Sequence, residues 1–117
     1  MNLPIVKMEK TILERLGYQV TFRTGSIEAL AVFKSDPNAF DLVITDMAMP
    51  NMTGDQLAAE LMAIRPDMPV IIFTGFSERI NEKKSASLGI KGYLKKPVLR
   101  SDMAHMIRKV LDEAQNA

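Results

Sequence analysis

The chain has 117 residues, 47% of them hydrophobic and 25% charged, with a formal net charge of +1, which is typical of a globular protein and gives no general attraction for nucleic acid or an anionic membrane. The absence of cysteine excludes disulfides and thiolate chemistry, and a single histidine excludes a histidine-based metal cluster. No apolar stretch approaches the ~20 residues of a membrane span, so we expect one cytoplasmic domain over residues 1–117.

The amino-terminal part of the chain predicts a helix from Pro4 to Leu16, because apolar residues recur there at helical spacing. Asn2 suits a cap, Pro4 a first helical turn and Gly17 a stop. The side chains expected on the inner face are Ile5, Met8, Ile12, Leu13 and Leu16, and those expected on the outer face are Lys7, Glu9, Lys10, Glu14 and Arg15.

Short apolar runs alternate with amphipathic segments along the rest of the chain. The runs Leu42–Thr45 and Val70–Phe73 are too short for helices and lack polar alternation, as in strands covered by helices on both faces. Regular alternation of helix and strand implies right-handed crossovers and a parallel sheet of the α/β class. The other predicted strands are Tyr18–Phe22 and Gly92–Leu94, and the other predicted helices are Ser26–Phe33, Asp55–Ile64, Arg79–Leu88 and Arg100–Ala114.

Three polar side chains follow three of these strands, namely Asp46, Thr74 and Lys96. The carboxyl ends of parallel strands meet at one edge of a sheet, where ligands of such folds bind. A carboxylate at this edge can attack phosphorus and form an acyl phosphate. Lys96 would supply a positive charge to the phosphoryl group, Thr74 a hydroxyl donor, and the loop around Ala48 backbone donors. A magnesium ion would complete the neutralisation, held by carboxylates and a backbone carbonyl.

In combination, three motifs spread over the chain resemble the receiver domain of two-component response regulators, and the resemblance runs through residues 4–114. It implies a flavodoxin-like, doubly wound parallel sheet with strand order 2-1-3-4-5, and a cis peptide bond before Pro97. The motifs are Asp46-x-x-Met49-Pro50-x-x-x-Gly54, Phe73-Thr74-Gly75 and Gly89-x-x-Gly92-Tyr93-Leu94-x-Lys96-Pro97.

The resemblance also implies roles for single residues. Asp46 would be the phosphoacceptor, taking a phosphoryl group from a histidine kinase or a phosphotransfer protein. Thr74 would be the switch hydroxyl, Tyr93 the aromatic side chain that moves with it, and Lys96 the cation that pairs with the phosphate. The Ala48 backbone carbonyl and Asp46 would bind magnesium. The chain would therefore be a signalling module that switches a protein-binding surface, and not an enzyme.

One feature of the family is missing from this sequence. Receiver domains begin with a strand that ends in two adjacent acidic residues, which bind the magnesium, whereas this chain begins with its first helix. The missing strand would lie between Tyr18–Phe22 and Leu42–Thr45, and the burial it provides is on the order of 10 kcal/mol, comparable with the stability of a whole domain. We expect that the sequence is truncated at its N-terminus relative to the family. The remaining sheet would then either close as four strands, with Tyr18–Phe22 paired directly with Leu42–Thr45, or be completed in a homodimer.

Two functional hypotheses remain open at this point. Asp46, Thr74 and Lys96 favour a phosphoacceptor domain, in which magnesium binding is weak or absent and phosphorylation slow. The missing acidic pair favours a phosphorylation-incompetent pseudo-receiver that acts as a protein-interaction or dimerisation module. His105 is expected to be an ordinary surface or half-buried residue, and the methionines of the loop after Asp46 are expected to fill gaps in the core.

Overall fold

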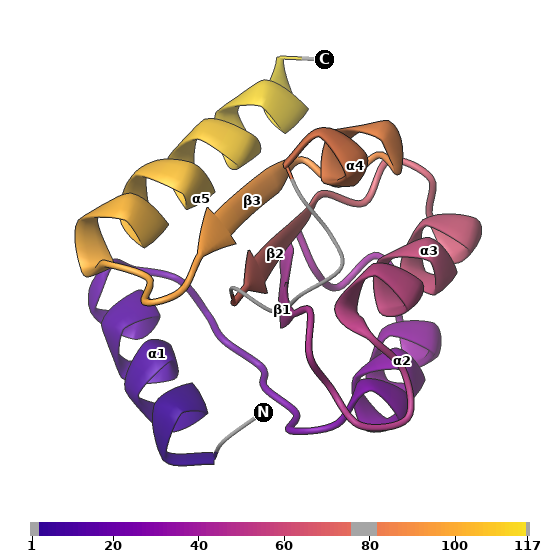
Figure 1. Cartoon of the computed structure of the whole chain (residues 1–117), viewed down its shortest axis with the longest axis horizontal. Helices are drawn as coiled ribbons and strands as arrows, with labels where there is room; N and C mark the ends of the chain where they lie inside the picture. Colours follow the sequence, from indigo (N-terminus) through magenta and orange to yellow (C-terminus); the bar gives the residue numbers. More distant parts are fainter. Residues whose placement is uncertain (1–2, 76–81, 117) are drawn as a thin grey trace.

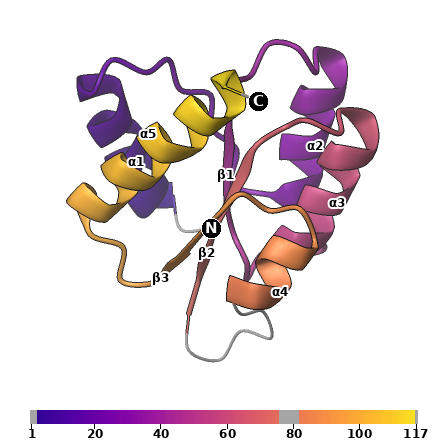
Figure 2. The ribbon, with the colours of Figure 1, turned by 90° about the horizontal axis from the view of Figure 1, so that it is seen from above.

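Three parallel strands, in the order β1-β2-β3, form the centre of the molecule. The computed structural model describes residues 3–75 and 82–116. Helices α1 and α5 cover one face of the sheet, and α2, α3 and α4 cover the other (Figures 1 and 2). The strands are β1 (Val43–Asp46), β2 (Val70–Thr74) and β3 (Gly92–Lys95), and the helices are α1 (Leu3–Arg15), α2 (Ser26–Ser35), α3 (Gly54–Ile64), α4 (Glu82–Ser87) and α5 (Arg100–Gln115).

The α/β class and the parallel sheet predicted from the sequence are confirmed. Each of the described helices and strands begins and ends within about three residues of its predicted bounds. The predicted cap Asn2 and the start of the predicted helix Arg79–Leu88 lie outside the described residues. Among the described residues, no helix is long and apolar enough to cross a membrane.

The burial of strand β2 on both faces explains why its sequence shows no alternation of polar and apolar residues. Its five residues are all buried, and successive side chains point to opposite faces of the sheet. Val70 and Ile72 pack in the core cluster that contains residues of α2 and α3, whereas Ile71 and Phe73 pack in the cluster that contains residues of α5. A strand with helices on both faces needs apolar side chains at every position.

The prediction of a strand at Tyr18–Phe22 is wrong. Residues 18–23 run without regular structure, and the described residues form a three-stranded sheet in which β1 is an edge strand. The direct pairing of this segment with β1 is therefore not formed. A strand exists only when a neighbour accepts and donates its backbone hydrogen bonds, and no described segment lies between these two. The sequence pattern reflects burial of alternate side chains, which does not by itself supply that neighbour.

The predicted inner face of α1 is also partly wrong. Ile5, Met8 and Leu16 are 48%, 57% and 49% exposed, and Val6 is the buried residue of this helix. Leu13, predicted to face inward, is half-buried. Apolar side chains lie on more than one side of α1, so periodicity alone could not decide which side meets the rest of the molecule.

Candidate functional site

Asp46, Thr74 and Lys96 lie at the same edge of the sheet, where β1, β2 and β3 end. In the strand register, Asp46 is opposite Phe73, and Thr74 is opposite Lys95. Lys96 follows directly, and its Nζ lies 3.0 Å from Asp46 Oδ1. The structure therefore joins Asp46 and Lys96 in an ion pair across β2, although 50 residues separate them in sequence.

Backbone hydrogen bonds fix the loops that carry these side chains. The Met47 N–H donates to Phe73 O at 2.8 Å, and the Lys96 N–H donates to Thr74 O at 2.7 Å, so both loops leave the sheet in continuation of the ladder. The Gly54 N–H donates to Met47 O at 2.8 Å, which holds the start of α3 against the end of β1. The backbone next to Asp46 is therefore held both by the sheet and by the start of α3.

A second tether holds the loop between β1 and α3. The buried Ser26 hydroxyl, at the start of α2, donates to Met52 O at 2.6 Å. Met47 is buried in the core and Met52 packs against it, which confirms that these two methionines fill the core. Met47 and Met52 thus anchor the loop to the core, whereas Ala48 of the same loop is exposed.

The polar groups of the site are buried but incompletely paired. The side chain of Asp46 is 6% exposed and that of Lys96 is 42% exposed. Asp46 Oδ1 lies within ion-pair distance of Lys96 but lacks hydrogen-bond geometry to any described residue, and the buried Thr74 Oγ1 also has no partner among them. Because buried polar atoms are normally hydrogen-bonded, an ion-paired carboxylate and a hydroxyl with no hydrogen-bond partner among the described residues suit a polar ligand at this edge.

Glu9 of α1 is a site residue that the sequence analysis missed, because it placed Glu9 on the outer face of the helix. The structure places it half-buried in the walls of the same two cavities as Asp46. Burial and the nearby negative charge of Asp46 raise the pKa of Glu9, and the positive charge of Lys96 lowers it by less. Glu9 lies three residues after the buried Val6, and i and i+3 share a helix face, but the sequence predicted Ile5 and Met8 instead of Val6 for the inner face and so gave no signal for Glu9.

The donor set at this edge does not fit a tightly bound magnesium ion. The described residues contain no group of three or more acidic or histidine side chains that could hold a metal. Glu9 and Asp46 are the acidic residues that line the cavity shared with Lys96, and Lys96 already pairs with Asp46. Magnesium requires a nearly ideal octahedral set of oxygen ligands, which these residues do not supply.

The remaining predicted residues lie as follows. Tyr93 is half-buried and packs against the core cluster on the α2 and α3 side of the sheet. The peptide bond between Lys96 and Pro97 is cis, as predicted. His105 is exposed on α5, which confirms that it is a surface residue.

A family model described as the response regulator receiver domain matches residues 3–108, which is most of the chain. The chain belongs to this family. It is therefore a receiver domain of two-component signalling, as its motifs predicted.

Curated and structural relatives agree with this assignment. The receiver domain is 35% identical over 108 residues to the two-component response regulator ARR10 of Arabidopsis thaliana, a match that covers 89% of this chain but 19% of the relative. It superposes with a TM-score of 0.92 on a response regulator receiver domain protein from Clostridium thermocellum, with 33% identity, covering 97% of this chain and 90% of that one. The chain spans about a fifth of the length of this curated relative.

A more distant structure shows the fold alone. The CheX–CheY–BeF3–Mg complex from Borrelia burgdorferi contains a chain that superposes with a TM-score of 0.85 and 22% identity, covering 93% of this chain and 82% of that one. Its magnesium and beryllofluoride belong to that complex.

Proposed function

We propose that Asp46 of this receiver domain accepts a phosphoryl group from a phosphohistidine of a histidine kinase or phosphotransfer protein. A carboxylate oxygen of Asp46 attacks phosphorus, the P–O bond forms as the P–N bond breaks, and the leaving imidazole takes up a proton. The observation that carries this proposal is the ion pair of the buried Asp46 with Lys96, at 3.0 Å, at the sheet edge where the Thr74 hydroxyl has no hydrogen-bond partner among the described residues.

Lys96 and Thr74 have distinct roles in the proposed reaction. The transferred group brings additional negative charge next to the buried Asp46, and the Lys96 ammonium compensates it as a compact point charge. The Thr74 hydroxyl donates a hydrogen bond to a phosphoryl oxygen and thereby gains a partner that no residue in 3–75 or 82–116 provides. Movement of Thr74 would be followed by Tyr93, which packs nearby on the sheet next to α4 and so transmits the change to a protein-binding surface.

The test is acyl-phosphate formation with acetyl phosphate, followed by intact-protein mass spectrometry at low temperature. The unmodified chain should gain one phosphoryl group, slowly because the described residues offer no acidic cluster that could hold a cation, and Asp46→Asn should gain none. Asp41→Asn is the matched control, since Asp41 is an exposed aspartate just before the same strand. Lys96→Met should lower the yield by at least about tenfold, because the phosphoryl dianion would lose the cation that pairs with it. Equal labelling of the unmodified chain and Asp46→Asn would contradict the proposal.

The second candidate is a pseudo-receiver that binds proteins without being phosphorylated. The observation that favours it is the lack of an acidic cluster among the described residues. It predicts no labelling of Asp46 by acetyl phosphate or by a phosphorylated histidine protein, together with unchanged folding of Asp46→Asn. Labelling of Asp46 by either donor would exclude it.

A further inference from the structure

Ser26, the first residue of α2, carries a fully buried hydroxyl. Its exposed fraction is 0%. Burial of a hydroxyl is unfavourable unless the hydroxyl is hydrogen-bonded, so a buried serine indicates a specific partner. The hydroxyl donates to Met52 O at 2.6 Å, across 26 positions of sequence. The bond therefore joins α2 to the loop that follows Asp46, and not to the next turn of its own helix.

The loop between β1 and α3 is closed at its base. The Met47 N–H donates to Phe73 O at 2.8 Å, and the Gly54 N–H donates to Met47 O at 2.8 Å. Residues 48–53 thus form a compact excursion from the end of β1, with both ends fixed at the sheet edge that carries Asp46. These two bonds hold the base of the loop and leave its tip to other contacts.

The tip of the loop is a three-residue turn in an unfavourable conformation. The Met52 N–H donates to Pro50 O at 2.8 Å, and Asn51 between them has a φ of 72°. A turn closed in this way around a positive φ is the rarer and more strained kind of γ-turn. Asparagine tolerates positive φ better than most residues, but strained conformations persist only where the surrounding structure holds them.

Ser26 supplies a contact that holds this turn. The backbone of Met52 is bonded on both sides, because its N–H closes the turn and its carbonyl accepts the hydrogen bond from Ser26. Among residues 3–75 and 82–116, no other group donates to Met52 O. Loss of the Ser26 hydroxyl would therefore leave this carbonyl without its protein partner and the turn without its polar tether.

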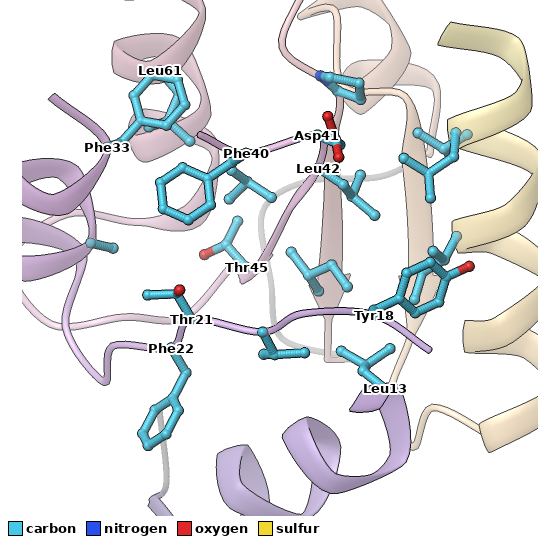
Figure 3. Close-up of a pocket in the computed structure, with 18 of the residues that line it drawn as sticks. Leu13, Tyr18, Thr21, Phe22, Phe33, Phe40, Asp41, Leu42, Thr45 and Leu61 are labelled. Atoms are coloured by element: carbon cyan, nitrogen blue, oxygen red, sulfur yellow. The ribbon is translucent and has the colours of Figure 1, made fainter. Parts of the chain in front are cut away.

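Helix α2 is a firm anchor for the tether. Leu30 and Phe33 of α2 are buried in the same core cluster as Leu61 of α3 (Figure 3). Phe33 also stacks on Phe40, with the ring centroids 6.3 Å apart. Because α2 cannot shift without disturbing this packing, the core sets the position of the Ser26 hydroxyl.

The turn lies next to the backbone that leaves Asp46. The Met47 N–H is taken by Phe73 O, so Ala48 is the first residue after Asp46 whose N–H makes no hydrogen bond within the part of the chain that the structure describes. An N–H in this position can donate to an oxygen of a group transferred to Asp46. Such a donor is effective when it is held in place before the reaction, and the turn begins at Pro50, only two residues after Ala48.

We propose that Ser26 is a positioning residue for phosphoryl transfer to Asp46. Its hydroxyl holds the strained turn of residues 50–52 and thereby fixes the backbone of Ala48 where its N–H meets a phosphoryl oxygen. Ser26 acts through the loop and not on the reacting atoms. The inference rests on the proposed function of Asp46 and adds to it a structural link between α2 and the site.

The experiment measures the rate constant for labelling of the full chain by acetyl phosphate, with intact-protein mass spectrometry. Ser26→Ala should lower it at least about fivefold, because the loop donor is no longer held in place. In the unphosphorylated chain, Ser26→Ala should also speed hydrogen exchange of the Met52 amide at least about tenfold. Ser35→Ala is the matched control, since Ser35 is exposed at the end of the same helix and donates locally to Val32 O at 2.7 Å, and it should change neither quantity.

A double variant separates positioning from a general effect on stability. Glycine adopts positive φ without strain, so Asn51→Gly makes the turn less dependent on a tether. In the Asn51→Gly background, Ser26→Ala should therefore lower the labelling rate by less than about twofold. A bond that only stabilised the fold would lower the free energy of unfolding equally in both backgrounds and leave the labelling rate of the folded chain unchanged.

Three results would overturn the inference. They are labelling of Ser26→Ala at the rate of the unmodified chain, an equal loss with and without Asn51→Gly, and unchanged exchange of the Met52 amide. If Ser26→Ala does not fold, Ser26→Cys takes its place, and its weaker S–H donor should lower the rate at least about twofold, an unchanged rate again contradicting the inference. If the unmodified chain is not labelled while the Met52 amide responds to Ser26→Ala, the proposed function of Asp46 fails and the tether to the turn stands.

Discussion

Glu9 shows how one charged side chain is held at a cost to stability. Its carboxylate is half-buried near the carboxylate of Asp46, and both burial and this neighbour raise its pKa above the usual value of 4.5. A raised pKa means that the folded chain binds the proton of Glu9 more tightly than the unfolded chain does. The ionised form of Glu9 therefore lowers the stability at neutral pH, and this penalty disappears once the pH falls below both pKa values.

Replacement of Glu9 by glutamine should accordingly stabilise the receiver domain at pH 7, and the gain should shrink as the pH falls through the folded pKa toward 4. Urea unfolding of both chains at several pH values measures this difference. The matched control is Glu14→Gln, which removes one carboxylate from an exposed position of the same helix. If the two variants show the same dependence on pH, the environment assigned to Glu9 is wrong.

At the scale of elements, the junction between β1 and α3 depends on a glycine. The N–H of Gly54 donates to Met47 O, and a Cβ at this position would collide with the backbone carbonyl oxygen of Asp46. Backbone atoms cannot rotate away as the end of a side chain can. Only a residue without a Cβ lets the start of α3 approach the carboxyl end of β1 this closely.

Gly54→Ala should therefore destabilise the chain by about 1–3 kcal/mol, although glycine to alanine in a helix normally stabilises it. Chemical denaturation gives the free energy of unfolding, and the amide shifts of Asp46 and Met47 report displacement of the site. Gly25→Ala, at the N-cap of α2, is the control, because its Cβ would meet only the flexible side chain of Glu28. If Gly54→Ala lowers the free energy of unfolding by no more than Gly25→Ala does, the loop between β1 and α3 can shift to accommodate a Cβ at little cost.

At the scale of the whole molecule, burial is uneven across the sheet. Strand β2 is buried at all five positions and has neighbours on both sides, whereas β1 is bordered by a cavity of about 1090 Å³. Residues of α1 and α5 line this cavity opposite β1. The sheet is thus tightly packed around β2 and more loosely packed on the side of β1 that faces residues 18–23.

Hydrogen exchange should follow this gradient. Amides of β2 should exchange most slowly and those of residues 18–22 fastest, and within β1 the Ile44 amide should exchange at least about tenfold faster than that of Thr45, which faces β2. Exchange monitored by ¹H–¹⁵N spectra of the isolated chain measures each amide. Uniform protection across β1 would mean that its outer edge is already paired.

The sequence by itself determined the α/β class, the bounds of most helices and strands, and the residues at the strand ends. Apolar runs without polar alternation identified β1 and β2, because a strand covered on both faces can carry no polar side chain in its middle. The order of the strands then placed Asp46, Thr74 and Lys96 at one edge. Local pattern and topology suffice for these features, since each depends on neighbours along the chain or on the rules of parallel sheets.

The tertiary structure decided the rest, because it depends on which partners are present in space. Residues 18–22 have the pattern of a strand but form none without a neighbour for their backbone, and periodicity did not show which side of α1 is buried. The proximity of Glu9 to Asp46 likewise appears only in the folded chain, where both side chains line the same cavities. A pattern of side chains specifies what a segment can bury, and only the assembled molecule supplies what it is buried against.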